Sequence, residues 1–339
     1  MGVPVFLLLL SQTLLGSGDP APTGSDPAHY ARYASVLLAQ HEYAKALSWI
    51  AKGLAVAPGN ASLRLREAIA LHALGKTSDS LKVLDALPPS GETAFYIGLN
   101  YRALGEHALA QKNLSQAWEM GFRDPYALYS LIDEDHALGD ASAGVRHFQT
   151  MLREFPDSPW LHVLYANAYI LKDQDDKARA EYEDALRLKQ DLPIVNFRLG
   201  YLMYKNGEYA RAAEYFRREI SLNPSYSDAN LFLGQTLRQL DLNQEAVGYL
   251  RKALALDSRS ELAYRSLAAA LTANGDLSGA VEVLLEAEKA FPQDPSIPAQ
   301  LVKLLTQLNR TNEALREQTT FRLLTESQRN REVAAPNKQ

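Results

Sequence analysis

The chain contains no cysteine among its 339 residues. This absence excludes disulfide bonds, thiolate nucleophiles and thiolate metal sites together. Lys and Arg are also too scattered to form a basic stripe, and the net charge is −5. Nucleic-acid binding requires such a stripe. We therefore expect no thiol chemistry and no nucleic-acid partner.

Motifs that would carry catalysis or metal binding are missing as well. The sequence has no phosphate-binding glycine loop, no nucleophile elbow and no pair of histidines on one helical turn. The acidic segment 133–136 (DEDH) points around the circumference of a helix. The segment 173–176 (DQDD) lacks the central Gly and terminal Glu of a calcium loop and fits a helix N-terminus. We predict no catalytic residue, no cofactor and no metal site.

Long apolar runs are limited to the first residues of the chain. Residues 3–15 (VPVFLLLLSQTLL) match the length of a signal-peptide core and are too short to span a bilayer comfortably. No Lys or Arg precedes this run, although a signal peptide usually has a positively charged flank there. A start codon assigned too far downstream would give the same appearance. We expect a signal peptide at 1–18, a flexible linker at 19–26, and no transmembrane span in the mature chain. If this signal peptide is used, we expect the protein to be exported, either to the periplasm or by secretion. If it is not used, we expect a cytoplasmic protein.

Small residues recur along the chain at a step of 34. Two series show this period: Ala166, Gly200, Gly234 and Ala268; and Ala178, Ala212, Ala246, Ala280 and Ala314. A fixed period of this length indicates repeats of a helical hairpin that cannot bury its apolar face alone. We expect the small residues where two helices cross, because only Gly and Ala let backbones approach closely.

The unit 193–226 shows the local pattern most clearly. Apolar residues from Phe197 to Tyr204 recur at three- and four-residue spacing, which predicts a helix. Gly207 ends it, because Gly tolerates the left-handed conformation that stops a helix. A second stripe from Ala212 to Ile220 predicts the partner helix, and Pro224 closes the unit because proline cannot continue a helix.

From Pro27 onward the chain resembles an array of tetratricopeptide repeats. The family's signature spacing is filled in that unit by Leu199, Gly200, Met203, Gly207, Glu208, Tyr209, Ala212, Tyr215, Phe216 and Pro224. Units begin at Pro27, Ala61, Gly91, Pro125, Pro159, Pro193, Ser227, Glu261 and Pro295. The resemblance implies an all-α, right-handed superhelical solenoid of antiparallel helix pairs over residues 27–328. A last helix from Thr311 to about Gln328 would cap the core, and 329–339 would form a disordered tail.

Some units depart from the pattern. The second unit is four residues short. The fourth has Ile132 where its neighbours carry Gly or Ala, and Asp135 where they carry Leu, Met or Tyr. The fifth has Asp173 in place of the glycine in the middle of the unit.

The resemblance implies that positions 2, 5, 9 and 12 of each first helix face a concave groove. Aromatic side chains interleaved with Arg, Asn and Gln suit a peptide groove, because rigid rings supply area and amides bond a peptide backbone. Alternatively, several of these aromatics pack between adjacent helices. The predicted groove residues are Phe95, Arg102, Tyr126, Tyr129, Asp133, His136, Trp160, Asn167, Phe197, Tyr201, Tyr204, Gln235, Arg238 and Arg265.

The function that this implies is a non-enzymatic scaffold that holds an extended peptide or a helix of a protein partner in its concave groove. The alternative is an assembly or stability subunit of a larger complex that uses its convex face or its ends. An enzyme without a recognisable motif is a third hypothesis. Contiguous exposed apolar area in the groove would favour the first, and an apolar terminal face the second.

Overall fold

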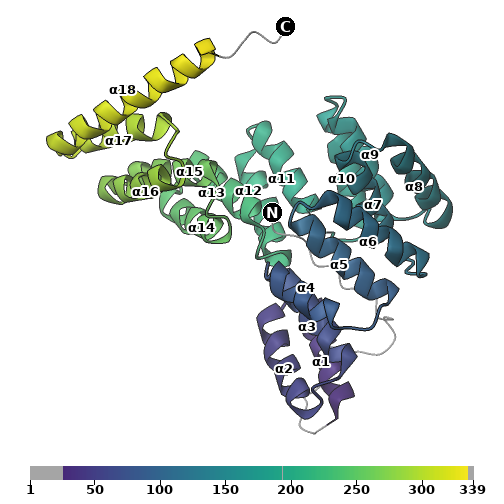
Figure 1. Cartoon of the computed structure of the whole chain (residues 1–339). Helices are drawn as coiled ribbons and strands as arrows, with labels where there is room; N and C mark the ends of the chain where they lie inside the picture. Colours follow the sequence, from purple (N-terminus) through teal and green to yellow (C-terminus); the bar gives the residue numbers. More distant parts are fainter. Residues whose placement is uncertain (1–25, 193, 335–339) are drawn as a thin grey trace. The chain divides into compact units, whose positions relative to one another are not determined.

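The computed structural model describes residues 26–192 and 194–334, with side chains through residue 329. Over these residues the fold consists of eighteen helices and contains no strand (Figure 1). The prediction of an all-α fold is therefore confirmed. The predicted signal peptide, all but the last residue of the linker, and residues 335–339 of the predicted tail lie outside the described residues.

The helices form consecutive hairpins, each with a first and a second helix. The first helices are α1 (Pro27–Ala39), α3 (Ala61–Ala73), α5 (Gly91–Ala103), α7 (Pro125–Ala137), α9 (Pro159–Ile170), α11 (Val195–Lys205), α13 (Ser227–Gln239), α15 (Glu261–Ala273) and α17 (Ser296–Gln307). The second helices are α2 (Tyr43–Val56), α4 (Thr77–Asp85), α6 (His107–Glu119), α8 (Ala141–Glu154), α10 (Asp175–Leu188), α12 (Tyr209–Leu222), α14 (Asn243–Leu256), α16 (Leu277–Ala290) and α18 (Thr311–Ala334). Each first helix except α11 and α17 begins at the predicted residue.

The chain divides into two compact units. Unit 1 runs to Asn206 and also includes Glu214–Tyr226, whereas unit 2 includes Gly207–Ala213 and the chain from Ser227 onward. Unit 1 therefore holds the first five hairpins, α11 and most of α12. The fourth and fifth hairpins, with all their predicted groove residues, belong to unit 1.

One backbone conformation joins the two helices of every hairpin. The residue at the fifteenth position of each repeat has a positive φ. These residues are His41, Gly75, Gly105, Gly139, Asp173, Gly207, Asp241, Gly275 and Asn309. Glycine adopts this conformation at little cost, and Asp, Asn and His are the other residues that visit it most readily. Asp173, which looked like a departure in the sequence, therefore makes the same turn as its glycine counterparts.

Most first helices begin at a side chain that caps them. The caps Asp26, Asn60, Ser90, Asp124, Ser158 and Ser260 each accept a hydrogen bond from a backbone N–H in the first turn. Helix α11 differs, because Ile194 before it is left-handed (φ 67°) and offers no cap. Glu219 of α12 takes this role and accepts from the backbone N–H of Ile194 at 3.1 Å and of Phe197 at 3.4 Å. The start of α11 at Val195 follows from this substitute cap.

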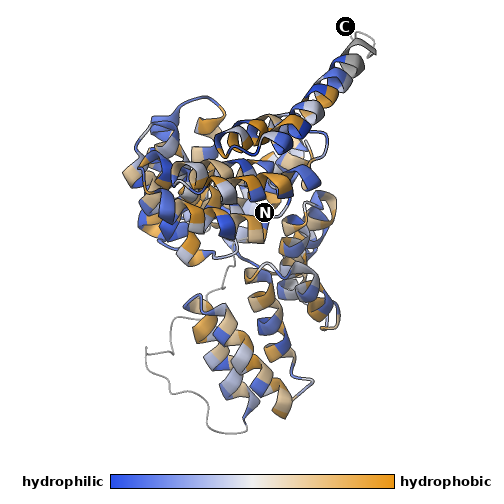
Figure 2. Ribbon diagram, turned by 90° about the vertical axis from the view of Figure 1, so that its left-hand side faces the viewer, coloured by the Kyte–Doolittle hydropathy of each residue, from blue (hydrophilic) through white to orange (hydrophobic). Residues whose placement is uncertain are grey.

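A small residue on the first helix faces a large one on the second. Gly98 lies against Leu114, Gly200 against Phe216, and in unit 2 Gly234 lies against Leu250. The large partners at the twenty-fourth position of the repeat are fully buried in seven hairpins: Ile50, Leu84, Leu114, Tyr182, Phe216, Leu250 and Leu284. Figure 2 shows hydrophobic and hydrophilic residues mixed along the helices, as expected when each helix buries one face.

The second and last hairpins differ in length from the others. Helix α4 has nine residues, which agrees with the shortened second repeat that begins at Ala61. Helix α18 has 24 residues and reaches Ala334, so the prediction of a helix that ends near Gln328 is corrected. Its Ala314 is buried beside α17, while most of the helix is exposed. None of the described helices combines the length and hydropathy needed to cross a membrane.

Candidate interaction surfaces

Four of the predicted groove aromatics pack against one another inside unit 1. The side chains of Phe95, Tyr126, Tyr129 and Trp160 are at most 3% exposed. The Trp160 ring lies 4.7 Å from the Tyr126 ring and 4.5 Å from the Tyr129 ring, centroid to centroid. Phe95 meets Tyr126 edge to face at 6.1 Å. These rings join the third, fourth and fifth first helices, so the expectation that they line an open groove is corrected.

The charged residues beside these rings bind one another. Arg102 pairs with Asp133 and with Glu134 at 3.3 Å, and it donates to Ser130 Oγ at 3.2 Å. Its guanidinium also lies 5.9 Å from the centroid of the Tyr129 ring. Burial alone would lower the pKa of Arg102, but the negative charge of Asp133 keeps that pKa above its ordinary value. Arg102 and Asp133 therefore hold α5 and α7 together.

The acidic segment of α7 is satisfied within the fold. Glu134 is buried and accepts from Arg102 and from His107, whose Nδ1 lies 2.7 Å from Glu134 Oε2. Asp135 is fully buried, with Gln111 Nε2 at 2.6 Å and His147 Nδ1 at 2.6 Å. Buried carboxylates are tolerated when such partners are present. These residues stabilise the hairpin junctions.

The remaining predicted residues of unit 1 are more accessible. Asn167 Oδ1 accepts from the Tyr182 hydroxyl at 2.6 Å. Tyr201 is 41% exposed and stacks on Phe197 with ring centroids 6.4 Å apart. Tyr204 is half-buried. Among these side chains, Tyr201 offers the largest apolar surface.

In unit 2 the predicted groove residues are polar and at least partly accessible. Gln235 Nε2 donates to Ser266 Oγ at 2.8 Å across neighbouring first helices. Arg265 is exposed and pairs with Glu261 at 3.3 Å, and Arg238 is half-buried. The sequence predicts no aromatic groove residue in this part of the chain. That Gln235, Arg238 and Arg265 bind a peptide stays a prediction.

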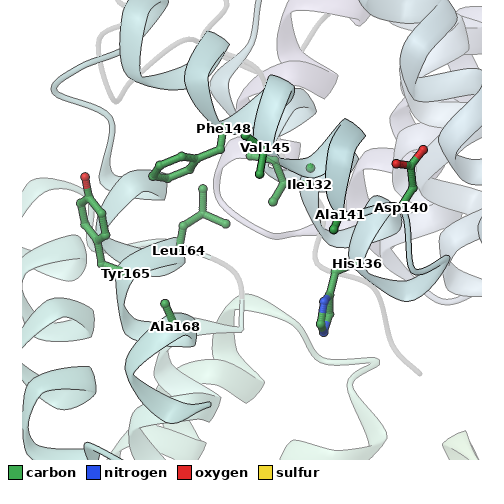
Figure 3. Close-up of a pocket in the computed structure, with 10 residues that line it drawn as sticks. Ile132, His136, Asp140, Ala141, Val145, Phe148, Leu164, Tyr165 and Ala168 are labelled. Atoms are coloured by element: carbon green, nitrogen blue, oxygen red, sulfur yellow. The ribbon is translucent and has the colours of Figure 1, made fainter. Parts of the chain in front are cut away.

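A cleft opens between α8 and α9 in unit 1, with a volume of about 320 Å³ (Figure 3). Phe148 and Tyr165 meet edge to face at one end, with ring centroids 6.1 Å apart. His136 and Asp140 lie at the other end. We name this surface the α8–α9 cleft. It is lined by Ile132, His136, Asp140, Ala141, Gly144, Val145, Phe148, Leu164, Tyr165 and Ala168.

One cluster of metal-ligand type occurs in the described residues, at His162, Glu181 and Asp184. His162 Nδ1 lies 2.7 Å from Glu181 Oε2, and Asp184 pairs with Arg187. The three groups are thus engaged in contacts between α9 and α10 and along α10. These contacts within the protein explain why the three side chains lie close together.

Family models match this chain over more than half of its length. Two models described as tetratricopeptide repeat match residues 197–261 and 243–295, and residues 37–94 and 136–195. The chain is a tetratricopeptide repeat (TPR) protein. TPR arrays are protein-interaction scaffolds, and this is the class of function that family membership gives to the chain.

The TPR relatives are longer proteins. The chain is 28% identical over 188 residues to the DnaJ protein P58IPK homolog B of Oryza sativa subsp. japonica, an alignment covering 51% of this chain and 40% of that protein. It is 23% identical over 252 residues to Anaphase-promoting complex subunit 6 of Arabidopsis thaliana, covering 70% and 45%. It therefore spans less than half the length of either. The crystal structure of the APC/C hetero-tetramer Cut9-Hcn1 matches with a TM-score of 0.58 at 16% identity, over 83% of this chain and 56% of that one.

Two hydrogen bonds in unit 1 of this TPR protein could not be predicted from the sequence. The Tyr43 hydroxyl donates to the carbonyl oxygen of Leu222 at 3.1 Å, and Ser225 Oγ donates to that of Ala73 at 2.8 Å. The first two hairpins thus meet the end of α12, more than 150 residues further along the chain. Tyr43 holds the same repeat position as Tyr209, so the pattern predicts only its place in the first hairpin, and the carbonyl acceptors carry no side-chain signature.

The cleft did have a sequence signal. Ile132 and Asp135 are the two departures of the fourth TPR, and both lie on the helix that supports the cleft. Both departures are visible in the sequence, but the resemblance places the first helix of the fourth repeat on the concave groove. An open seam between neighbouring hairpins was not predicted.

Proposed function

We propose that this TPR protein is a non-enzymatic subunit that assembles with protein partners through its second helices and the turns of its hairpins. The observation that carries this proposal is the burial of Phe95, Tyr126, Tyr129 and Trp160. A groove whose anchors are packed between its own helices has little apolar surface to give a peptide. Unit 1 would therefore bind a partner through the faces that its second helices and turns form.

The exposed apolar side chains of unit 1 support this choice. In its first helices, large exposed apolar residues among those described are limited to Tyr165 and Tyr201. The second helices and the hairpin ends carry the others, namely Val56, Leu104, Leu109, Met120, Leu138, Val145, Leu152, Leu171 and Leu188. In the TPR family the second helices form the convex face. Exposed apolar surface gains free energy when a partner covers it.

The relatives support a subunit role in the same direction. The Arabidopsis relative is by name a subunit of the anaphase-promoting complex. That name describes the relative alone. It supports the proposal that this TPR array also serves as a subunit of an assembly.

The test compares substitutions on the two faces. The full chain would be purified from its native host by an affinity tag after crosslinking, and its partners quantified by mass spectrometry. Leu109→Asp on α6 and Leu188→Asp on α10 change exposed residues and should release a stoichiometric partner while leaving the helical circular dichroism unchanged. Tyr201→Ala should keep that partner. Loss of the partner in Tyr201→Ala alone would reject assembly through the outer face.

The concave groove of the sixth repeat is the second candidate. Tyr201 is 41% exposed beside Phe197, so α11 offers an aromatic surface to a peptide. In the experiment above this candidate predicts the opposite pattern, with binding lost on truncation of Tyr201 and kept in both leucine variants.

A further inference from the structure

We propose that the α8–α9 cleft docks an amphipathic α-helix of a partner protein, which inserts a large apolar side chain against Phe148 and Leu164 and directs a basic side chain toward Asp140. This proposal rests on the proposed subunit function and gives it a site. The occupant is a helix with apolar residues three or four positions apart and a Lys or Arg one to two turns away.

The cleft arises from the first departure of the fourth repeat. Elsewhere in unit 1, Gly98 and Gly200 leave room for Leu114 and Phe216, which are fully buried. In the fourth repeat Ile132 fills that room, and the corresponding large residue is Phe148. Phe148 is only partly buried and lines the cleft. The bulk of Ile132 therefore displaces Phe148 from the position that its counterparts occupy.

The second departure turns α8 about its axis. Asp135 is fully buried, and His147 of α8 reaches in to bind its Oδ2 at 2.6 Å. The inward face of α8 then carries Ala143, His147 and Met151 at four-residue steps. Residues four apart share one face of a helix. With Ala143, His147 and Met151 on the inward face, Val145 points outward and is 56% exposed.

The neighbouring hairpin shows the consequence. Tyr165 of α9 is 40% exposed, although Leu199 and Leu233 at the same position of the next two repeats are fully buried. Helix α6 packs along α7 and α10 along α11, whereas α8 does not pack along α9 in this manner. The seam between α8 and α9 is thus left open, with apolar side chains from α7, α8 and α9 around it.

The chemistry of the lining selects a helix as the occupant. The walls are helices, whose backbone groups are already bonded within each helix, so an extended peptide would find few partners for its own N–H and C=O groups. A helix satisfies its own backbone and needs only apolar contacts, as in other helix-in-groove complexes. The lining is mostly apolar between the Phe148 end and the Asp140 end.

The charge at the polar end selects a basic residue on that helix. Backbone N–H of Ala143 and the Ser142 hydroxyl bind Asp140 and lower the pKa of its carboxyl group. The exposed Asp140 is therefore ionised at neutral pH and attracts a cation. Asp140 is the one acidic residue among those that line the cleft, and His136 lies at the same end.

The test uses two phage-displayed libraries on the purified full chain: helical 16-residue peptides randomised on one face, and unstructured 16-residue peptides. Selected peptides would be labelled with fluorescein and titrated by anisotropy. We expect binders from the helical library that share two apolar residues three or four apart and a Lys or Arg. Val145→Asp should weaken their binding at least tenfold, because the new carboxylate lies in the apolar lining.

Leu315→Asp on α18 is the matched control, since Leu315 has the same exposed fraction of 56% and lies outside the cleft. It should leave the dissociation constant unchanged within twofold. A third variant closes the cleft by restoring the regular repeat: Ile132→Ala with Asp135→Leu gives Phe148 its usual room and removes the buried acid. This double variant should bind the peptides at least tenfold more weakly while keeping its helical circular dichroism.

Three outcomes would overturn the proposal. They are binders drawn only from the unstructured library, binding that survives Val145→Asp, and concentration-dependent self-association of the unmodified chain that Val145→Asp abolishes. The last would identify a second copy of the chain as the occupant. If helical binders fail but Leu109→Asp and Leu188→Asp still release the native partner, the cleft is rejected and the proposed function stands.

Discussion

The backbone of Gly200 on α11 lies directly against the ring of Phe216 on α12. A Cβ added to Gly200 would sit 2.8 Å from Phe216 Cε1, closer than carbon atoms pack in proteins. We therefore expect Gly200→Leu to lower the free energy of unfolding by roughly 1–3 kcal/mol or more through overpacking. Urea denaturation followed by circular dichroism measures this. The exposed Glu214→Leu should change it by less than about 0.5 kcal/mol, and equal stabilities for both variants would refute the helix pairing.

The contact between Tyr43 and Leu222 gives a second prediction. Tyr43→Phe removes the hydroxyl that donates to Leu222 and lies 2.6 Å from His41 Nδ1. The loss of a partly buried hydrogen bond should lower the free energy of unfolding by about 1 kcal/mol. Tyr165→Phe, whose ring is 40% exposed, serves as the control. If the two variants have the same denaturation midpoint, the contact does not stabilise unit 1.

Glu219 should make stability depend on pH in the acidic-to-neutral range. Burial raises its pKa to about 7, against 4.5 for an exposed Glu, although the N–H groups of Ile194 and Phe197 act in the opposite direction. A raised pKa favours the protonated folded state, so this stabilisation is complete below pH 4.5 and is lost as pH rises through 7. The loss amounts to roughly 3 kcal/mol. Glu219→Gln should remove this slope from unfolding curves recorded between pH 4.5 and 8, and an unchanged slope would contradict the assignment.

His72 should give a slope of the opposite sign. Burial lowers its pKa to about 4 from 6.5, despite its hydrogen bond to Asn100 Oδ1 at 3.0 Å. The neutral ring is favoured in the folded state, so this stabilisation is complete above pH 6.5 and is lost as pH falls through 4. Its size is again roughly 3 kcal/mol. Relative to the unmodified chain, His72→Leu should gain stability as pH falls from 7 to 4, and a constant difference would show that His72 does not titrate on unfolding.

Two tyrosines on predicted groove positions should behave differently. Tyr129→Ala removes a ring packed on Trp160 and should lower the free energy of unfolding by about 3–5 kcal/mol. Tyr201→Ala removes a ring that is 41% exposed and should lower it much less. Thermal denaturation of both variants decides the matter. Similar losses for the two would mean that Tyr201 is also a core residue.

The local structure followed from the sequence because it depends on neighbouring residues. The 34-residue step predicts the starts of most first helices, and Gly200 and Ala212 indicate where two helices cross. The start of α11 was missed because Glu219, on the next helix, replaces the usual cap. Asp173 was read as a departure, although its backbone makes the same turn as glycine.

The angles between neighbouring hairpins of unit 1 were much harder to predict. Whether Tyr126 and Trp160 face a groove or each other depends on how tightly neighbouring hairpins pack, and no single repeat encodes that angle. The rotation of α8 depends on a pair, Asp135 and His147, that lie twelve residues apart on different helices. The burial of Asp135 was the decisive fact, and a charged residue at an apolar position was the only sign of it in the sequence.

The meeting of Tyr43 with Leu222 also constrains how this protein can change in length. An array in which each hairpin touches only its neighbours tolerates the gain or loss of a repeat, because every joint is equivalent. Here the first hairpins reach the end of α12 only if the intervening hairpins add up to the observed rotation and rise. A duplication or deletion between α5 and α10 would separate Tyr43 from Leu222 and Ser225 from Ala73. The number of repeats in unit 1 is therefore fixed by geometry, and variation in repeat number among close relatives should be confined to sequence beyond Tyr226.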